Sequence, residues 1–318
     1  MHSVLSDPVD HSVEFDVEVS LRPNLTGRLS SSDAPATSTN HPSDGNLQRA
    51  DGCGQIVLSV SESGTRIEHT FERSPIRIMF PRTAGCDVKE AVLVNTAGGI
   101  AGGDRLEFSV TALPEAIIAV TSQAAEKVYR ALREPARVVT RLKARECAKL
   151  AWLPQETIVF DGARLQRTTE IELFSGAELL ALEWLVLGRA AHGEVVVVGH
   201  ISDGWRVTKD GRLIWADCFR VTDEVFPHLH RKALLSDYNA IATLIYFGPD
   251  LDRRLEFLRE VSSSMKCNCA VTLVAGLIVV RFAAKGSFEL KLGLRSFLEQ
   301  FGPEVGAGPF QVPKMWAC

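Results

Sequence analysis

A glycine-rich stretch, NTAGGIAGGD at residues 95–104, is the first segment whose composition could do chemistry. Glycines behind an apolar run can cradle phosphate when a helix follows, because a helix N-terminus attracts anions. The nearest register, A-x-G-x-x-G beginning at Ala97, lacks one glycine of the dinucleotide fingerprint, and the Gly-Lys-Ser/Thr of a P-loop is missing. Leu106, Phe108 and Val110 then alternate with polar residues. This alternation predicts a strand, so we favour a bend between two strands and keep a nucleotide-dependent enzyme as the alternative.

Two close pairs of soft side chains could bind a metal ion, namely Cys267 with Cys269 and His228 with His230. Neither pair has the second pair that a zinc site requires at a fixed spacing. The cysteines are expected to pack in the core, where free thiols are common, and the histidines to be solvated. Scattered Ser, His and Asp residues match no catalytic motif. The sequence therefore indicates neither a resident metal nor an enzyme.

The segments that must position any site are strands for most of the chain. Over residues 55–221, short runs of alternating apolar and polar residues are separated by Gly, Pro and Asp, which predicts mostly antiparallel sheets. Helical spacing appears only later, at 231–247, 250–261 and 288–301, with a hairpin at 267–284. The prediction is a mainly β (α+β) fold with a few helices in the C-terminal third.

The chain divides by composition into a short extension and one large domain. Residues 30–46 are rich in Ser, Thr, Pro, Asp and Gly and have almost no apolar side chain that could offset the entropy of ordering. We therefore expect residues 1–50 to form a flexible N-terminal extension and residues 51–318 to form a single β-rich domain.

Composition limits the partners. Hydrophobic residues make up 46% of the chain and the formal net charge is −4, so no general affinity for nucleic acid or for an anionic membrane is expected. The N-terminus lacks the apolar core of a signal peptide, the longest apolar run is too short to span a membrane, and the seven cysteines are odd in number. These features predict a cytoplasmic protein with reduced thiols.

Several segments match one family in their order along the chain. They are NTAGGIAGGDRL, TSQAAEKVYRA, WLPQETIVFDGARLQRTTEIEL, ALEWLVLGRAAHGE and the terminal VPKMWAC. Together they resemble the urease accessory protein family called UreD or UreH, from about residue 55 to residue 318. The resemblance implies an irregular fold of stacked, β-helix-like, antiparallel-rich sheets.

The resemblance also implies a function. Members of this family are non-enzymatic assembly factors that bind apo-urease and the accessory proteins UreF and UreG, and that support nickel delivery to the urease active site. We therefore expect a scaffold and conduit with no tightly bound cofactor, through which nickel passes in transit. Oxygen ligands suit such a role, because imidazole and thiolate clusters hold first-row metal ions too tightly to release them.

Four carboxylates on the matched motifs are the predicted nickel path. Glu156 and Glu183 lie between apolar neighbours in strands, where a buried acid needs a partner, a metal ion or water. Asp104 and Asp161 lie beside glycines, so plain turns explain them equally well. The residues expected to supply counter-charge or to dock a partner are Lys127, Tyr129, Arg130, Arg164 and Arg189.

Overall fold

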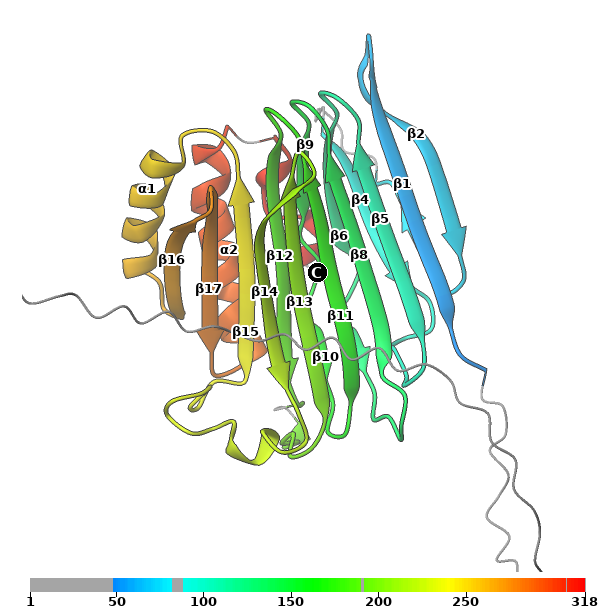
Figure 1. The fold of residues 1–318 in the computed structure, drawn as a ribbon, viewed down its shortest axis with the longest axis vertical. Helices are drawn as coiled ribbons and strands as arrows, with labels where there is room; N and C mark the ends of the chain where they lie inside the picture. Colours follow the sequence, from blue (N-terminus) through cyan, green and yellow to red (C-terminus); the bar gives the residue numbers. More distant parts are fainter. Residues whose placement is uncertain (1–47, 82–87, 190–191, 307, 318) are drawn as a thin grey trace, which may run out of the picture. The chain divides into compact units, whose positions relative to one another are not determined.

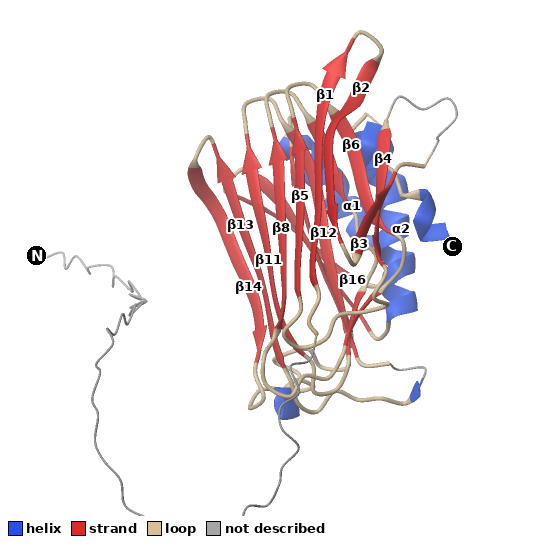
Figure 2. Cartoon of the chain, turned by 90° about the vertical axis from the view of Figure 1, so that its right-hand side faces the viewer, coloured by secondary structure: helices blue, strands red, loops and turns tan. Residues whose placement is uncertain are grey.

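The computed structural model describes residues 48–81, 88–189, 192–306 and 308–317. Within these residues, two β-sheets stack face to face and two helices cover the outer face of one of them (Figures 1 and 2). The mainly β fold and its C-terminal helices are therefore confirmed. The predicted extension lies, up to residue 47, outside the described residues.

The first sheet, called sheet A, is seven-stranded in the part of the chain that the structure describes. Its strands in spatial order are β14 (Arg212–Val221), β13 (His200–Lys209), β11 (Arg164–Leu173), β8 (Ala136–Ala144), β5 (Arg105–Ala112), β1 (Asp51–Ser61) and β2 (Gly64–Arg73).

The second sheet, called sheet B, is ten-stranded over the same described residues. Its main path is β16 (Asn268–Val274), β17 (Leu277–Ala284), β15 (Ala240–Phe247), β12 (Glu178–Leu187), β9 (Lys149–Trp152), β6 (Ile117–Ser122), β4 (Lys89–Asn95) and β3 (Ile76–Met79). Off this path, β10 (Thr157–Val159) pairs with β12 and with β7 (Glu126–Val128).

Strand direction differs from the sequence prediction in the middle of both sheets. From β4 to β13 the chain passes back and forth between sheets B and A, so strands that are neighbours within a sheet are one coil apart. Strands β1, β5, β8, β11 and β13 consequently pair in parallel, as do β4, β6, β9 and β12. Antiparallel pairing is found toward the edges, for example between β1 and β2 and between β13 and β14. The stacked, coiled architecture is as expected, whereas the central pairing is parallel.

The two sheets have different burial patterns because only one is covered on both faces. In β8 and β11, buried residues alternate with partly or fully exposed ones, so one face of sheet A meets sheet B and the other meets solvent. In β12 every residue is buried. One face of β12 packs against sheet A and the other against the helices, which explains its nearly continuous apolar sequence, ELLALEWLVL.

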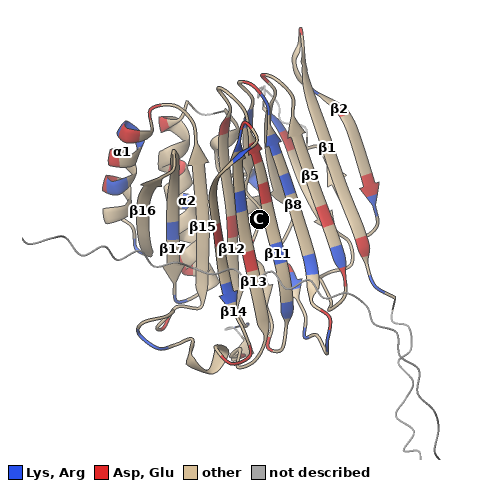
Figure 3. Ribbon diagram, in the orientation of Figure 1, with Lys and Arg blue, Asp and Glu red and all other residues tan. Residues whose placement is uncertain are grey.

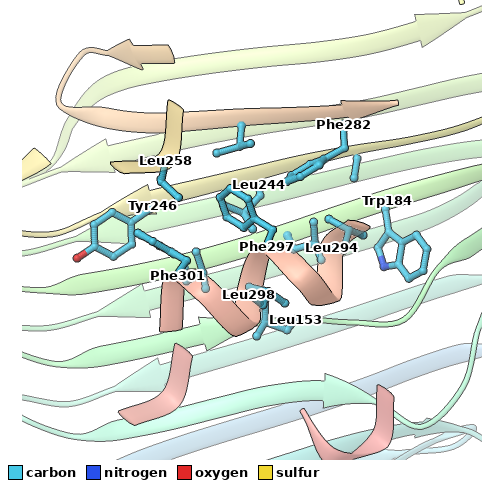
Figure 4. Close-up of a cluster of buried hydrophobic side chains, with 14 of the residues drawn as sticks. Leu153, Trp184, Leu244, Tyr246, Leu258, Phe282, Leu294, Phe297, Leu298 and Phe301 are labelled. Atoms are coloured by element: carbon cyan, nitrogen blue, oxygen red, sulfur yellow. The ribbon is translucent and has the colours of Figure 1, made fainter. Parts of the chain in front are cut away.

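Helices α1 (Leu251–Ser263) and α2 (Ser287–Glu304) form where the sequence predicted them. Their buried residues recur every three or four positions and pack on sheet B (Figure 4). Phe297 of α2 meets Phe282 edge to face, with 5.2 Å between ring centroids, and Phe301 meets Tyr246 in the same way at 5.0 Å. Short 3₁₀ turns at η2 (Phe226–His228), η3 (Gly308–Phe310) and η4 (Lys314–Ala317) complete the regular structure described. No helix in the described ranges is long and apolar enough to cross a membrane.

The glycine-rich stretch connects β4 of sheet B to β5 of sheet A. Gly98, Gly99 and Gly103 have positive φ angles of 73°, 153° and 88°, a backbone conformation that favours glycine. A Cβ atom on Gly102 would lie only 2.5 Å from the Cβ of Ala131, so this position also requires glycine. Strand β5 follows at once, as predicted.

The secondary structure predicted for two segments is wrong. Residues 231–247, predicted to be helical, form turns followed by strand β15, which pairs with β12 and β17. The valine run at 195–198, predicted to continue a strand, lies in a connection before β13. Pairing with the neighbouring strands outweighs the local helical spacing in the first segment.

Candidate functional site

A buried ion cluster lies between the two sheets, where β11 and β13 of sheet A face β12 of sheet B. Arg167 of β11 donates to Asp203 of β13 through Nε and Nη2, at 2.8 and 2.7 Å. Its Nη1 lies 2.6 Å from Oε2 of Glu183 on β12 and 3.0 Å from the hydroxyl of Thr157. Trp152 donates its indole N–H to the other oxygen of Glu183 at 2.8 Å. Glu183, predicted from the sequence, is thus at the centre of a polar site inside an apolar core.

Burial sets the electrostatics of this cluster. The side chains of Arg167, Glu183 and Asp203 are 4%, 5% and 9% exposed. Burial raises the pKa of Glu183, opposed by the attraction of Arg167 and reinforced by the nearby charge of Asp203. Burial alone would lower the pKa of Arg167, but Asp203 and Glu183 outweigh it and raise that pKa, so the guanidinium stays charged. One cation is therefore shared between two carboxyl groups in a medium of low dielectric.

Two cavities meet at Glu183. The larger, of about 510 Å³, is bounded by Asp203 and Asp217 of sheet A and by residues of β15, β16 and β17. The smaller, of about 180 Å³, lies on the side of Arg167 and is bounded by residues of β4 to β9. Glu183 lines both cavities, whereas Arg167 lines only the smaller and Asp203 only the larger. The ion cluster therefore separates the smaller cavity from the larger one, which reaches the exposed side chain of Arg281.

The smaller cavity holds a second acid that the sequence analysis did not identify. Glu126 of β7 accepts two hydrogen bonds of 3.1 Å from the side-chain amide of Asn95. Burial raises the pKa of the Glu126 carboxyl, against the hydrogen bonds from Asn95, which lower it. Gln155 also borders this cavity, and its side-chain oxygen is buried without a hydrogen-bond partner among the described residues. The cavity is therefore lined by polar groups at Glu126, at Gln155 and at the ion cluster, with apolar side chains between them.

The larger cavity carries a second ion pair near solvent. Asp217 of β14 lies 2.7 Å from the Nη2 atom of Arg281 on β17, whose side chain is 50% exposed. Arg281 also donates to the hydroxyl of Thr243. Cys269 borders the same cavity, and burial raises the pKa of its thiol to about 12. At neutral pH this cysteine is a protonated thiol, so the ionised groups that face the cavity are carboxylates and arginines.

The other predicted acids lie elsewhere. Glu156 is half buried next to the start of α2, where Ser287 donates to it at 3.2 Å, and it borders neither of the two cavities. Its second oxygen has no hydrogen-bond partner among the described residues. The structure therefore does not bring Glu156 and Glu183 into one cluster.

Asp104 and Asp161 stabilise turns through hydrogen bonds to the backbone. Asp104 accepts backbone N–H groups of Ala50 and Ala101 at 2.9 and 2.7 Å. Asp161 accepts two backbone N–H groups from residues 197 and 198 and lies 2.6 Å from Arg130. Burial would raise the pKa of Asp161, but these hydrogen bonds and Arg130 outweigh it and lower the pKa. Both side chains have the geometry of structural caps.

The predicted counter-charges belong to other acids. Arg130 pairs with Asp161, Arg164 with Asp223 at 2.7 Å and Arg189 with Glu194 at 2.9 Å. The cation that pairs with Glu183 is Arg167, so the expectation that one of those three arginines would do so was wrong. Each of these three arginines donates a hydrogen bond to the acid with which it pairs.

Two further residues were predicted to contribute to a docking surface. Lys127 is exposed on β7. Tyr129 is 38% exposed, packs edge to face on Phe160 and donates its hydroxyl to the carbonyl of Gly98. Tyr129 directly follows β7, so both side chains lie near the end of this short strand.

The soft side chains do not form a metal site. In the residues described, no group of three or more His, Cys, Asp or Glu is arranged to hold a metal ion. Cys267 is buried against Gly293 of α2, as expected for core packing. His230 contacts the backbone carbonyl of Ser236.

Arg167 and Asp203 are the main residues that the sequence analysis missed. A signal for them exists, because each occupies an inward position of an alternating strand. Arg167 lies between Leu165 and Thr169, and Asp203 lies between Ile201 and Trp205. A charged side chain at such a position needs a buried partner, which is the argument that identified Glu183.

The comparisons with known proteins agree with the motifs. A sequence model of the UreD urease accessory protein family matches residues 50–317. The chain is 36% identical over 271 residues to the urease accessory protein UreD of Chelativorans sp. strain BNC1, covering 85% of this chain and 95% of the relative. It is 40% identical over 270 residues to the UreD of Xanthobacter autotrophicus, with 85% and 91% covered. It is also 40% identical over 273 residues to that of Rhizobium johnstonii, with 85% and 96% covered. These matches confirm the resemblance, and they show that the chain belongs to the UreD family of urease accessory proteins.

Proposed function

We propose that this chain acts in urease maturation by binding apo-urease, UreF and UreG, and by letting nickel pass through its interior. The observation that carries the nickel proposal is the position of Glu183, a buried acid that borders two cavities at once. Membership of the UreD family supports the wider role. In this proposal the chain is a cytoplasmic, non-enzymatic scaffold and conduit without a tightly bound cofactor.

The donor groups around the cavities suit a metal ion in transit. Carboxylates of Glu183, Asp203 and Asp217 border the larger cavity, and Glu126 with amide oxygens borders the smaller. Oxygen ligands bind first-row divalent ions less tightly than imidazole or thiolate clusters do. A conduit needs sites weak enough to release the ion toward the next one, as conduction through channels also requires.

Arg167 has a defined part in this proposal. A guanidinium held between Glu183 and Asp203 repels a divalent cation at the point where the cavities meet. Passage therefore requires Arg167 to release Glu183, so that the carboxylate can face the ion instead. Because Asp203 holds Arg167 through two hydrogen bonds, the guanidinium can stay on Asp203 while Glu183 turns.

The alternative function, a nucleotide-dependent enzyme using the glycine loop, has little support. Strand β5 begins at Arg105, directly behind the loop, where a phosphate-binding loop would require a helix N-terminus. Asp104 uses both carboxylate oxygens on backbone N–H groups. The glycine loop instead serves as the connection between β4 of sheet B and β5 of sheet A.

The test measures nickel in urease that matures with variants of this chain. Glu183→Gln keeps the size of the side chain and removes the charge, and should lower the nickel content of purified urease severalfold while the accessory complex still assembles. Glu172→Gln on the outer face of sheet A is the matched control, because Glu172 pairs with Lys143 in solvent, and it should load urease normally. Unchanged nickel content with Glu183→Gln would reject the interior path.

Glu156→Gln is measured in the same assay to resolve the two predicted acids. Because Glu156 faces α2 and borders neither cavity, we expect a smaller loss of nickel than with Glu183→Gln. A loss as large as that of Glu183→Gln would place the route on the helix side of sheet B instead. Co-purification of apo-urease and UreF with each variant checks that assembly is intact.

A further inference from the structure

The outer face of sheet A carries a row of arginines without acidic partners. Arg105 of β5 lies directly opposite Arg137 of β8, and the same cross-strand row continues through Gln166 and Ser202 to Arg220 of β14. We call Arg105, Arg137 and Arg220 the arginine row. All three are exposed, and none forms an ion pair with another described residue.

Most other charges on this face are paired, although Arg206 of β13 is also exposed and forms no ion pair with a described residue. Arg141 lies 3.3 Å from Glu107 and 3.1 Å from Glu170, and Lys143 lies 2.7 Å from Glu172. Glu107 lies in the next cross-strand row, two residues after Arg105 on β5, and it pairs with Arg141 rather than with an arginine of the row. The acid at the row's own end, Asp51, pairs with Arg73 on the outer strand β2. Every carboxylate near the row is thus engaged elsewhere.

Like charges directly opposite each other on neighbouring strands destabilise a sheet. Arg105 and Arg137 occupy such a pair, in a chain whose formal net charge is −4. Asp51 lies opposite Arg105 on the β1 side but pairs with Arg73, so no ion pair among the described residues offsets the contact between the two arginines. An external group that carries negative charge would compensate both.

The surface beside the row suits close contact with another protein. The next cross-strand row begins at Glu107 and continues through small, uncharged side chains, namely Val139, Thr168, Gly204 and Cys218. In the part of the chain that the structure describes, both helices lie against sheet B and no helix covers this face (Figures 2 and 3). The row spans four strand spacings, or about 19 Å at about 4.8 Å each, which fits within an ordinary protein interface.

We propose that the arginine row and the flat strip beside it form a docking surface for a protein partner that presents carboxylates. Nucleic acid is disfavoured, because the chain as a whole is acidic, with a formal net charge of −4, and because Glu107 lies in the cross-strand row beside the arginines. An acidic protein surface can instead face the arginines with carboxylates and meet the neighbouring rows with neutral groups. This inference rests on the proposed function, since it locates where one of the maturation partners binds.

The test compares two triple variants of the full-length chain in binding purified apo-urease and purified UreF. The first carries Arg105→Glu, Arg137→Glu and Arg220→Glu. The matched control carries Arg212→Glu, Arg259→Glu and Lys266→Glu, three exposed side chains with no ion pair among the described residues and the same total change in charge. Thermal unfolding of both variants checks that they are folded.

We expect the arginine-row variant to weaken binding of at least one of the two proteins by about 10- to 100-fold, while the control changes affinity little. The wild-type affinity for that protein should also fall between about 0.05 and about 0.5 M salt, and the row variant should lose most of this dependence. If wild type binds and the row variant binds equally well, the docking surface is rejected and the proposed function stands. If wild type binds neither protein, the proposed partners and this surface are rejected together.

A single substitution separates docking from structural support. Arg137→Gln removes the like-charge contact with Arg105, so the stability of the chain should stay the same or rise slightly. Binding of the partner should nevertheless weaken. A variant that loses stability and keeps its affinity would show that the row supports the fold and would overturn the proposal.

Discussion

The two faces of sheet A carry the same arrangement of charges in two different environments. On the inner face, Arg167 of β11 binds the carboxylates of Glu183 and Asp203. On the outer face, Arg141 of the neighbouring strand β8 binds those of Glu107 and Glu170. Each is one arginine between two acids, so the comparison isolates the effect of solvent.

Exposure separates the two clusters. The inner side chains are 4–9% exposed and the outer ones 46–49% exposed. The inner contacts are also shorter, at 2.6–2.8 Å against 3.1–3.3 Å. Removing charges from water is costly, and a buried cluster is tolerable only when every member stays paired. The outer cluster has no such requirement, because water solvates whichever charge is left over.

The largest expected effect is therefore that of removing the inner arginine. Arg167→Met leaves two carboxyl groups buried without a cation and should lower the free energy of unfolding by about 3–5 kcal/mol. Urea unfolding at neutral pH measures this loss.

A triple variant checks the cause of that loss. Arg167→Met combined with Glu183→Gln and Asp203→Asn removes all three charges and should recover most of the stability. A triple variant as unstable as Arg167→Met alone would show that the packing of Arg167, rather than charge, had been lost.

A smaller effect is expected for the pH dependence of stability through Glu183. Burial raises its pKa in the folded protein above the ordinary value near 4.5, so the folded state holds this proton to higher pH than the unfolded state does. The stabilisation from this protonation is complete below the unfolded pKa and is lost as the pH rises through the folded pKa. Relative to Glu183→Gln, the wild type should therefore lose stability as the pH rises from the ordinary value near 4.5 through the raised pKa of the folded protein.

Urea unfolding of both proteins across that pH range measures the difference. The difference cancels the titration of groups that the two proteins share. A difference in free energy of unfolding that does not change with pH would mean that Glu183 keeps its ordinary pKa through its contact with Arg167.

The sequence was sufficient to predict the inner acid but not its partners. Glu183 has apolar neighbours within one short run of residues, so its burial can be inferred locally. Its cation, Arg167, is on another strand, and Arg167 binds Asp203 because the two residues are direct cross-strand neighbours in the parallel pair of β11 and β13. That register depends on how the coils stack, and no single run of residues contains this information.

The direction of the central strands was predicted wrongly for the same reason. Alternation of apolar and polar residues has a period of two in both parallel and antiparallel strands, so it locates a strand without giving its direction. The segment at 240–247 shows the converse error, because its closely spaced apolar residues also fit a helix. It is a strand because it pairs with β12 and β17, which is a contact between distant parts of the chain.

The smallest expected effect completes the comparison at the outer cluster. Arg141→Met removes the same number of contacts between charged groups as Arg167→Met, yet it should change the free energy of unfolding by no more than about 1 kcal/mol. Salt screens exposed pairs, so even this difference should shrink as the ionic strength rises. Urea unfolding at low and high salt measures both quantities. A loss comparable to that of Arg167→Met would mean that the outer cluster stabilises the fold as strongly as the buried cluster does. Burial would then not be what distinguishes the two faces.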